Sequence, residues 1–246
     1  MTGSPIVSAL PLVQWSFVRF VERYFYLCTS LLTAAVVMYG FSHTIDRRLI
    51  HANPPPPLLL WVHSIVFSAW VAFYVLQCTL VRLRKVKLHR MLGWVGVALG
   101  AAMIVVGPWV ALVMARFDTM QLHRPNRDAF LIVPLSDILA FAIVFTLAIL
   151  WRRNSERHRR LILIASSVLT GAAFGRMPFM HAPLQFYGGV DGLIILGASR
   201  DLLVERRIHA VYLTAVPLLI TAQTIAAQIF LHRWPFWIRL AHTLVG

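Results

Sequence analysis

Residues 88–115 read LHRMLGWVGVALGAAMIVVGPWVALVMA, and this stretch decides the fold class. From Met91 to Ala115 it contains no charged side chain. A helix rises about 1.5 Å per residue, so about 20 apolar residues cross the hydrocarbon core of a bilayer. The stretch therefore predicts a transmembrane helix over roughly residues 90–115. Gly96 and Gly100 form a small-xxx-small pair within it, which predicts close packing inside the helix bundle.

Apolar runs of similar length recur along the rest of the chain. Hydrophobic residues make up 59% of the 246 positions and charged residues 13%, whereas a soluble domain carries about 25% charged residues. The expected fold is all-α, a polytopic bundle of seven transmembrane helices that forms one domain over residues 1–246. The other six predicted spans cover roughly residues 22–42, 58–81, 129–151, 160–177, 186–204 and 209–231.

The two ends of the chain are apolar but do not match the length or pattern of a span. Residues 1–20 are interrupted by Pro5 and Pro11, which favours a segment lying at the membrane surface. The tail, residues 232–246, combines basic residues with aromatic ones such as Trp234. Aromatic side chains gather at membrane–water interfaces, so we expect the tail to be interfacial as well.

Lysine and arginine residues predict how the bundle is oriented. Three basic loops, residues 82–90, 152–160 and 200–208, together with Arg19 and Arg23 hold 15 of the 23 Lys and Arg residues, and the opposite side holds 8. The positive-inside rule then places the N-terminus in the cytoplasm and the C-terminus outside. Because the net charge of +14 lies in short loops between apolar runs, it favours a lipid bilayer as partner and argues against nucleic-acid binding.

Four polar residues in the predicted outer half of the bundle are candidates for a buried cavity or ligand site: His63, Asp137, Arg176 and Asp191. From the helical rise, His63 and Asp191 lie about 8 Å and Asp137 about 12 Å below the outer ends of their spans. An ionisable group at such depth costs about 2.5–3.5 kcal/mol or more unless it is paired, protonated or in contact with water. A structural ion-pair network, a proton relay and a substrate site all remain open.

A metal site is a further alternative at the same place. His63, Asp137 and Asp191 supply one imidazole and two carboxylates, an acceptable ligand set for a divalent metal. Such a site would fit an intramembrane metal-dependent hydrolase. The sequence contains neither HExxH nor HxxxH, so this alternative depends on the three side chains converging in the fold.

Histidines also stand at the cytoplasmic starts of three predicted spans: His89, His158 and His209. Two imidazoles facing each other across a bundle can be the axial ligands of haem b, and neighbouring arginines can pair with its propionates. The alternative is that each histidine contacts solvent or lipid headgroups beside a basic loop.

Two resemblances add to these readings. LHRMLGW (Leu88–Trp94) resembles the HRxLG element that opens helices in b-type membrane cytochromes and ferric-reductase-like domains, which implies haem binding there. Over nearly the whole chain, the combination of HSIVFSAW, LHRMLGW, PLSDILAF, GRMP and RRIHAVYL is similar to a bacterial family of seven-span inner-membrane proteins. That similarity implies a multi-pass protein of the bacterial inner membrane and implies no established activity.

Three function classes therefore stay open, and whether the protein is an enzyme is undecided. The first is an inner-membrane protein whose buried polar cavity serves transport or small-molecule binding. The second is a haem-b electron-transfer protein, and the third is an intramembrane metal-dependent hydrolase.

Overall fold

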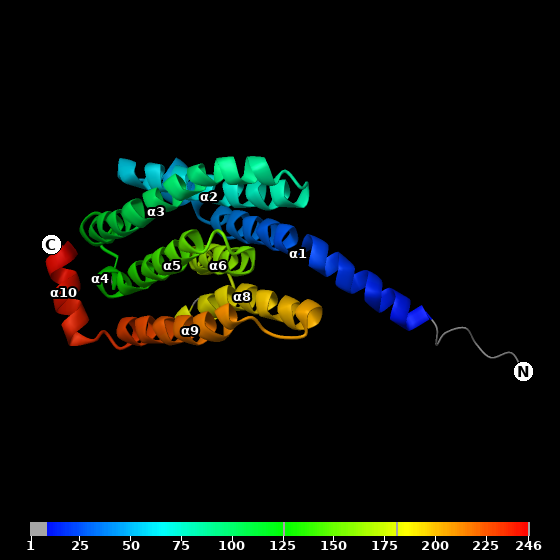
Figure 1. Ribbon diagram of the computed structural model, residues 1–246. Coiled ribbons are helices and arrows are strands. Elements are labelled where there is room, and N and C mark those ends of the chain that lie inside the picture. Colours follow the sequence, from blue (N-terminus) through cyan, green and yellow to red (C-terminus); the bar gives the residue numbers. More distant parts are fainter. Residues whose placement is uncertain (1–8, 125, 181, 246) are drawn as a thin grey trace, which may run out of the picture.

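The computed structural model describes residues 9–124, 126–180 and 182–245, and within these ranges the chain is helical with no strand. The long helices run roughly side by side in one bundle, and a short C-terminal helix crosses one end of it (Figure 1). In chain order the elements are α1 (Ala9–Ser42), the π-helix η1 (Asp46–Ile50), α2 (Leu58–Arg82), α3 (Val86–Met120), α4 (Arg127–Phe130), α5 (Ile132–Leu150), α6 (Ser155–Val168), α7 (Gly171–Phe174), α8 (Pro183–Glu205), α9 (Ala210–Leu231) and α10 (Pro235–Val245).

Five segments of the described chain are long and apolar enough to cross a membrane. They are Phe17–Ser42, Leu58–Arg82, Val86–Met120, Arg127–Leu150 and Ala210–Leu231. These segments are compatible with an integral membrane protein. The other two predicted spans do not meet the same criteria of length and composition.

The first of these two, predicted over residues 160–177, is an interrupted helix. Helix α6 ends at Val168, and the four-residue helix α7 begins at Gly171. At the break, the Ser167 carbonyl accepts both the backbone N–H of Thr170, at 2.9 Å, and its hydroxyl, at 2.6 Å, in place of regular helical pairing. A single continuous helix was therefore the wrong expectation for this segment.

The second, predicted over residues 186–204, is a continuous helix, α8, that carries several charged residues. Asp191 lies near its middle, and Arg200, Asp201 and Glu205 lie in its last turns. These charges lower the apolar character of α8. Its neighbours in the bundle are α1, α6, α7 and α9.

Both chain ends are helical in the described part. Helix α1 already begins at Ala9, so residues 9–20 are continuous with the first helix, whose candidate membrane span begins at Phe17. Residues 1–8 lie outside the described part. The C-terminal tail folds into α10, which packs against α3 and α4, and Trp237 donates its indole N–H to the Ala129 carbonyl at 3.1 Å.

The core of the bundle is built around an aromatic cluster on α2 and α5. Trp70 lies edge-on to Phe141 and Phe145, with ring centroids 5.5 Å apart in both cases. The close approach predicted for the glycines of α3 is present. A methyl group added at Gly96 would overlap Phe73, and one added at Gly100 would overlap Phe145. The absence of these side chains lets α3 pack closely on α2 and α5.

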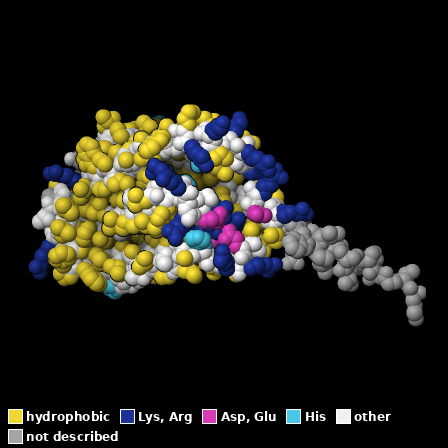
Figure 2. Space-filling view, in the orientation of Figure 1, with side chains coloured by type: hydrophobic (Ala, Val, Ile, Leu, Met, Phe, Trp, Pro, Cys, Tyr) yellow, Lys and Arg dark blue, Asp and Glu magenta, His cyan; other side chains and the backbone are white. Residues whose placement is uncertain are grey.

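The surface of the bundle matches a membrane environment. Figure 2 shows a broad hydrophobic face with Lys and Arg gathered toward both ends of the molecule. Acidic side chains are grouped at one of these ends among the basic ones.

Gly40 of α1 gives a direct test of how α1 packs on α7. A Cβ atom added at Gly40 would overlap the backbone carbonyl of Ala173, which has no flexible side chain to move aside. We expect Gly40→Ala to lower the free energy of unfolding by about 1–3 kcal/mol. Gly93→Ala is the control, because nothing lies within 4 Å of its added Cβ and alanine favours a helix. Equilibrium unfolding in mixed detergent micelles measures both, and equal stability of the two variants would contradict this packing.

Candidate functional site

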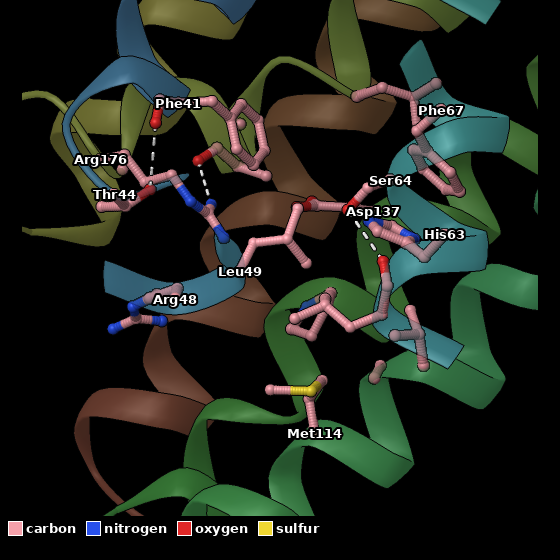
Figure 3. A pocket seen from close by; sticks show the side chains of 18 of the residues that line it. Phe41, Thr44, Arg48, Leu49, His63, Ser64, Phe67, Met114, Asp137 and Arg176 are labelled. Carbon is pink, nitrogen blue, oxygen red and sulfur yellow. Dashed lines mark hydrogen bonds between the residues drawn. The ribbon is translucent and has the colours of Figure 1, made fainter. Parts of the chain in front are cut away.

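A cavity of about 1100 Å³ lies within the bundle, and it is the candidate functional site. Its walls come from α1, α2, α3, α5 and the interrupted α6–α7 segment, with η1 and the Pro-rich connector at one end. Figure 3 shows Arg48 and Arg176 at one side of this space and His63 and Asp137 at the other. Ligand pockets in proteins measure about 300–1,000 Å³, so this cavity has room for a sizeable molecule.

The structure brings three of the four predicted cavity residues together. His63, Asp137 and Arg176 all line the cavity, although they come from α2, α5 and the segment after α7. Asp191 is not among the lining residues. Its carboxylate lies close enough to the Gln223 side chain of α9 to interact with it, one turn after Tyr187 on the same face of α8. The structure therefore brings three of the four predicted residues to the cavity lining and leaves Asp191 outside it.

His63 stands on an apolar wall of the cavity. Its ring lies 4.0 Å, centroid to centroid, from Phe67 on the next turn of α2. Its Nδ1 atom is buried and has no hydrogen-bond partner within the described part of the chain. The neighbouring Ser64 donates its hydroxyl to the Leu60 carbonyl at 2.8 Å (Figure 3).

Asp137 is held from the other side of the bundle. Tyr187 of α8 donates its phenol O–H to Asp137 Oδ1 at 3.2 Å. Oδ2 of the same carboxylate faces α7 so closely that a methyl group at Gly171 would lie 3.4 Å from it. The interrupted helix therefore passes next to the buried acid, and a larger residue at position 171 would crowd it.

Arg176 does not bridge the two buried acids. Its Nη1 donates to the Ala172 carbonyl, and its guanidinium lies 4.3 Å from the centre of the Phe41 ring. Across the described residues, no ion pair joins it to Asp137 or Asp191. The ion-pair network that the sequence left open is therefore absent from this cluster.

The geometry also gives no metal centre at His63, Asp137 and Asp191. In the part of the chain that the structure describes, no three His, Cys, Asp or Glu side chains are grouped closely enough to hold a metal ion. The expected convergence fails because His63 and Asp137 line the cavity and Asp191 lies outside its lining. The three proposed metal ligands of an intramembrane hydrolase are therefore not brought together.

The three inner histidines have separate environments. His158 Nδ1 makes a 2.9 Å hydrogen bond with the Ala148 carbonyl, and its ring is close enough to His89 for the two to interact electrostatically. His89 Nδ1 is buried without a partner within the described chain. His209 Nδ1 accepts the Val211 backbone N–H at 3.1 Å and so caps the start of α9. None of the three lines the cavity.

Sequence reasoning missed the most strongly paired charges in the structure. Arg160 of α6 and Asp201 of α8 are both fully buried, and they are joined by two parallel hydrogen bonds of 2.7 Å. Glu156 and Glu205 also accept from Arg160, at 2.6 and 2.7 Å. Arg200 completes the set by pairing with Asp201 and Glu205. This group, here called the inner ion-pair network, ties α6 to α8.

A sequence signal for the network was present. Only nine acids occur in the chain, and three of them, Glu156, Asp201 and Glu205, lie inside the basic segments. Glu156 and Arg160 are four residues apart, which places them on one helix face. The excess of arginine in these segments predicts topology, whereas the acids among the arginines are the signal for ion pairing.

Comparison with known proteins does not add to this picture: no family model, no curated protein and no solved structure matches the chain.

The inner ion-pair network predicts a strong effect of removing one partner. Asp201→Asn leaves the buried Arg160 without its main counter-charge, so we expect a loss of about 3–5 kcal/mol in unfolding free energy. Removing both charges with Arg160→Met and Asp201→Leu should cost less than the single change, because no isolated buried charge remains. Unfolding in mixed micelles measures both, with the exposed Arg153→Gln as control. A double variant at least as damaged as Asp201→Asn would show that the pair does not act in this way.

Proposed function

We propose that this protein is a multi-pass protein of the bacterial inner membrane that binds a small molecule in the cavity lined by His63, Asp137 and Arg176. One observation carries the proposal. A cavity of about 1100 Å³ opens among apolar helices and is lined by the ionisable side chains of His63, Asp137 and Arg176. Ionisable groups among membrane helices are costly to bury, and in membrane proteins they mark ligand and ion sites.

The interruption between α6 and α7 supports the same function. Thr170, Gly171 and Ala172 lie at the break and all line the cavity. In hydrocarbon, irregular backbone is tolerated where it is enclosed by protein or borders a water-filled cavity. Membrane transporters place substrate sites at interrupted helices of this kind. Transport is therefore the role that we propose for the bound molecule, ahead of a purely structural one.

We further propose that the bundle crosses the membrane seven times, with the N-terminus in the cytoplasm. The α6–α7 segment and α8 would complete the count, because the inner ion-pair network satisfies the charges that make α8 less apolar. Reporter fusions test this orientation. Alkaline phosphatase fused after residue 245 should be active, and the same reporter fused within the 152–155 loop should be inactive. The reverse pattern would overturn the orientation.

Ligand binding can be tested by filling the cavity. Met114 lines it, and a tryptophan at this position would occupy part of the space (Figure 3). Native mass spectrometry of the purified protein should show a bound small molecule in the wild type, and Met114→Trp should lower its occupancy at least about tenfold. Leu139→Trp is the matched control, because Leu139 is 61% exposed on the outside of α5 and should keep the ligand. Absence of any bound mass from wild type, even after incubation with a membrane extract, would refute the proposal.

A haem-b electron-transfer role is the second candidate, and one observation favours it. The Nδ1 atom of His158 is held by the Ala148 carbonyl, which leaves Nε2 free, and His89 lies within electrostatic reach. Metal-ligating histidines characteristically have one ring nitrogen fixed in this way. If haem binds here, the purified protein should show a Soret band that shifts on dithionite reduction and is lost in His89→Ala and His158→Ala. A colourless wild-type protein that stays colourless when haem is supplied during expression would remove this candidate.

A further inference from the structure

Arginines gather at one end of the cavity. Among the described residues that line it, five are arginines: Arg47, Arg48, Arg124, Arg127 and Arg176. They come from three places far apart in the sequence, namely the η1 segment between α1 and α2, the α3–α4 connection with the first residue of α4, and the α7–α8 connection. By the alternation of the helices, these connections meet at the end of the bundle opposite the inner ion-pair network, so the fold itself assembles this charge.

The acids near these arginines do not balance them. Asp118 pairs with Arg124 at 3.4 Å and with Arg127 at 3.2 Å, so one carboxylate is shared by two guanidiniums. Arg48 and Arg176 make no ion pair with an acid in the described part of the chain, and each lies within electrostatic reach of the other. Arg48 is also close enough to Arg124 and Arg127 to be repelled by them, and the one acid that attracts it, Asp118, is already shared by those two arginines. An anion placed between Arg48 and Arg176 would relieve this repulsion.

The rest of the cavity has the opposite character. In Figure 3, Leu49 lies between the arginine side and the His63 side, Phe67 lies beside His63, and Met114 lies on the wall below them. Farther residues of the lining include Trp70 and Met103, which are 5% and 0% exposed. The buried polar atoms without partners, Trp70 Nε1 and Ser166 Oγ, lie on this apolar wall. A ligand that fits this lining therefore has an anionic group at one end and a long apolar body.

We infer that the cavity binds an anionic amphiphile, a single-chain molecule with a phosphate or carboxylate head. The head lies between the guanidiniums of Arg48 and Arg176, and the apolar chain occupies the space along Phe67 toward Trp70. Guanidinium pairs bind phosphate and carboxylate groups through paired N–H donors, which gives the head its position. The apolar chain moves from the bilayer to a cavity wall of similar polarity, so it contributes little to the choice of ligand. The arginines therefore determine the selectivity for an anionic head. This inference names the ligand class and depends on the proposed binding function.

Defined probes test it. The protein in nanodiscs of neutral phosphatidylcholine is titrated with dodecyl phosphate, dodecanoate, dodecanol or inorganic phosphate, and binding is followed by native mass spectrometry and tryptophan fluorescence. We expect dodecyl phosphate to bind at least about tenfold more tightly than dodecanol, because charge-assisted hydrogen bonds form only with the anion. Inorganic phosphate should bind much more weakly than dodecyl phosphate, since it lacks the chain. The order of dodecyl phosphate and dodecanoate identifies which head the site prefers.

Variants at the arginines locate the head group. Arg48→Gln and Arg176→Gln should each weaken dodecyl phosphate binding about tenfold or more and leave dodecanol binding unchanged. Arg176→Lys, which keeps the charge, should lie between Arg176→Gln and wild type and guards against loss of folding at this position. Arg153→Gln, at the opposite end of the bundle, is the matched control.

The outcomes separate the two proposals. If dodecyl phosphate and dodecanol bind equally, and Met114→Trp abolishes both, the cavity binds ligands but the anionic head is refuted. A neutral molecule that co-purifies with the protein would likewise refute the anionic head and leave the binding function standing. If Arg48→Gln and Arg176→Gln bind dodecyl phosphate as wild type does, the assignment of the head group is wrong. If no probe binds and no molecule co-purifies, the proposed function itself fails.

Discussion

The buried pair of Arg160 and Asp201 is the interaction on which the rest of the bundle depends. It joins α6, which is short and interrupted, to α8, which carries charges that an isolated membrane helix would not tolerate. Two ions removed from water are costly unless their geometry is good and their remaining hydrogen-bonding capacity is used. Here both conditions are met, because Glu156, Glu205 and Arg200 surround the pair. By composition alone, neither helix would be assigned as a membrane span, and each depends on the other for the partners of its charged residues.

Fixing α6 and α8 together has consequences at the other end of the bundle. Because α6 is held at its first turns, its far end can break off at Val168 and pass into α7 without unfolding the segment. The break borders the cavity, and the close contact of α7 with Gly40 of α1 supports its exposed backbone. A rigid charged anchor at one end thus permits an irregular, ligand-accessible backbone at the other. This division fits a protein that must be stable in the membrane and still present a binding cavity.

The two charged regions of the molecule have different functions. In the inner ion-pair network acids and arginines neutralise each other, and its role is structural. Around the cavity, Asp118 alone is ion-paired with arginines in the described chain, so positive charge remains in excess there. Arginines without acidic partners beside an apolar space are the basis of the anionic ligand proposed above. The same residue type is neutralised by acids at one end of the bundle and left in excess at the other, and only the nearby acids distinguish the two.

Particular residues show how far the sequence could be read. The all-helical class and the spans at 58–81 and 90–115 followed from unbroken apolar runs, since a backbone in hydrocarbon must satisfy its hydrogen bonds within a helix. The close approach at Gly96 and Gly100 followed from their spacing. The break at Thr170 did not, because its sequence remains apolar and its irregular backbone is stabilised by neighbouring helices. The free-energy cost of burying His63 and Asp137 marked them as candidate site residues. That cost does not depend on the direction of their side chains, so it could not predict what they contact.

The sequence by itself determined that this chain is a helical, membrane-compatible protein with polar groups at unusual depth, because hydropathy is a local property of each segment. Only the tertiary structure decided which of those groups meet. On α8, Tyr187 reaches Asp137, and Asp191, one turn later on the same face, lies beside Gln223 of α9 and outside the lining of the cavity. Rotation about a helix axis depends on how several helices pack at once, and no single run of sequence contains that information. For the same reason, the arginines of three distant connections form one site only when the bundle is assembled.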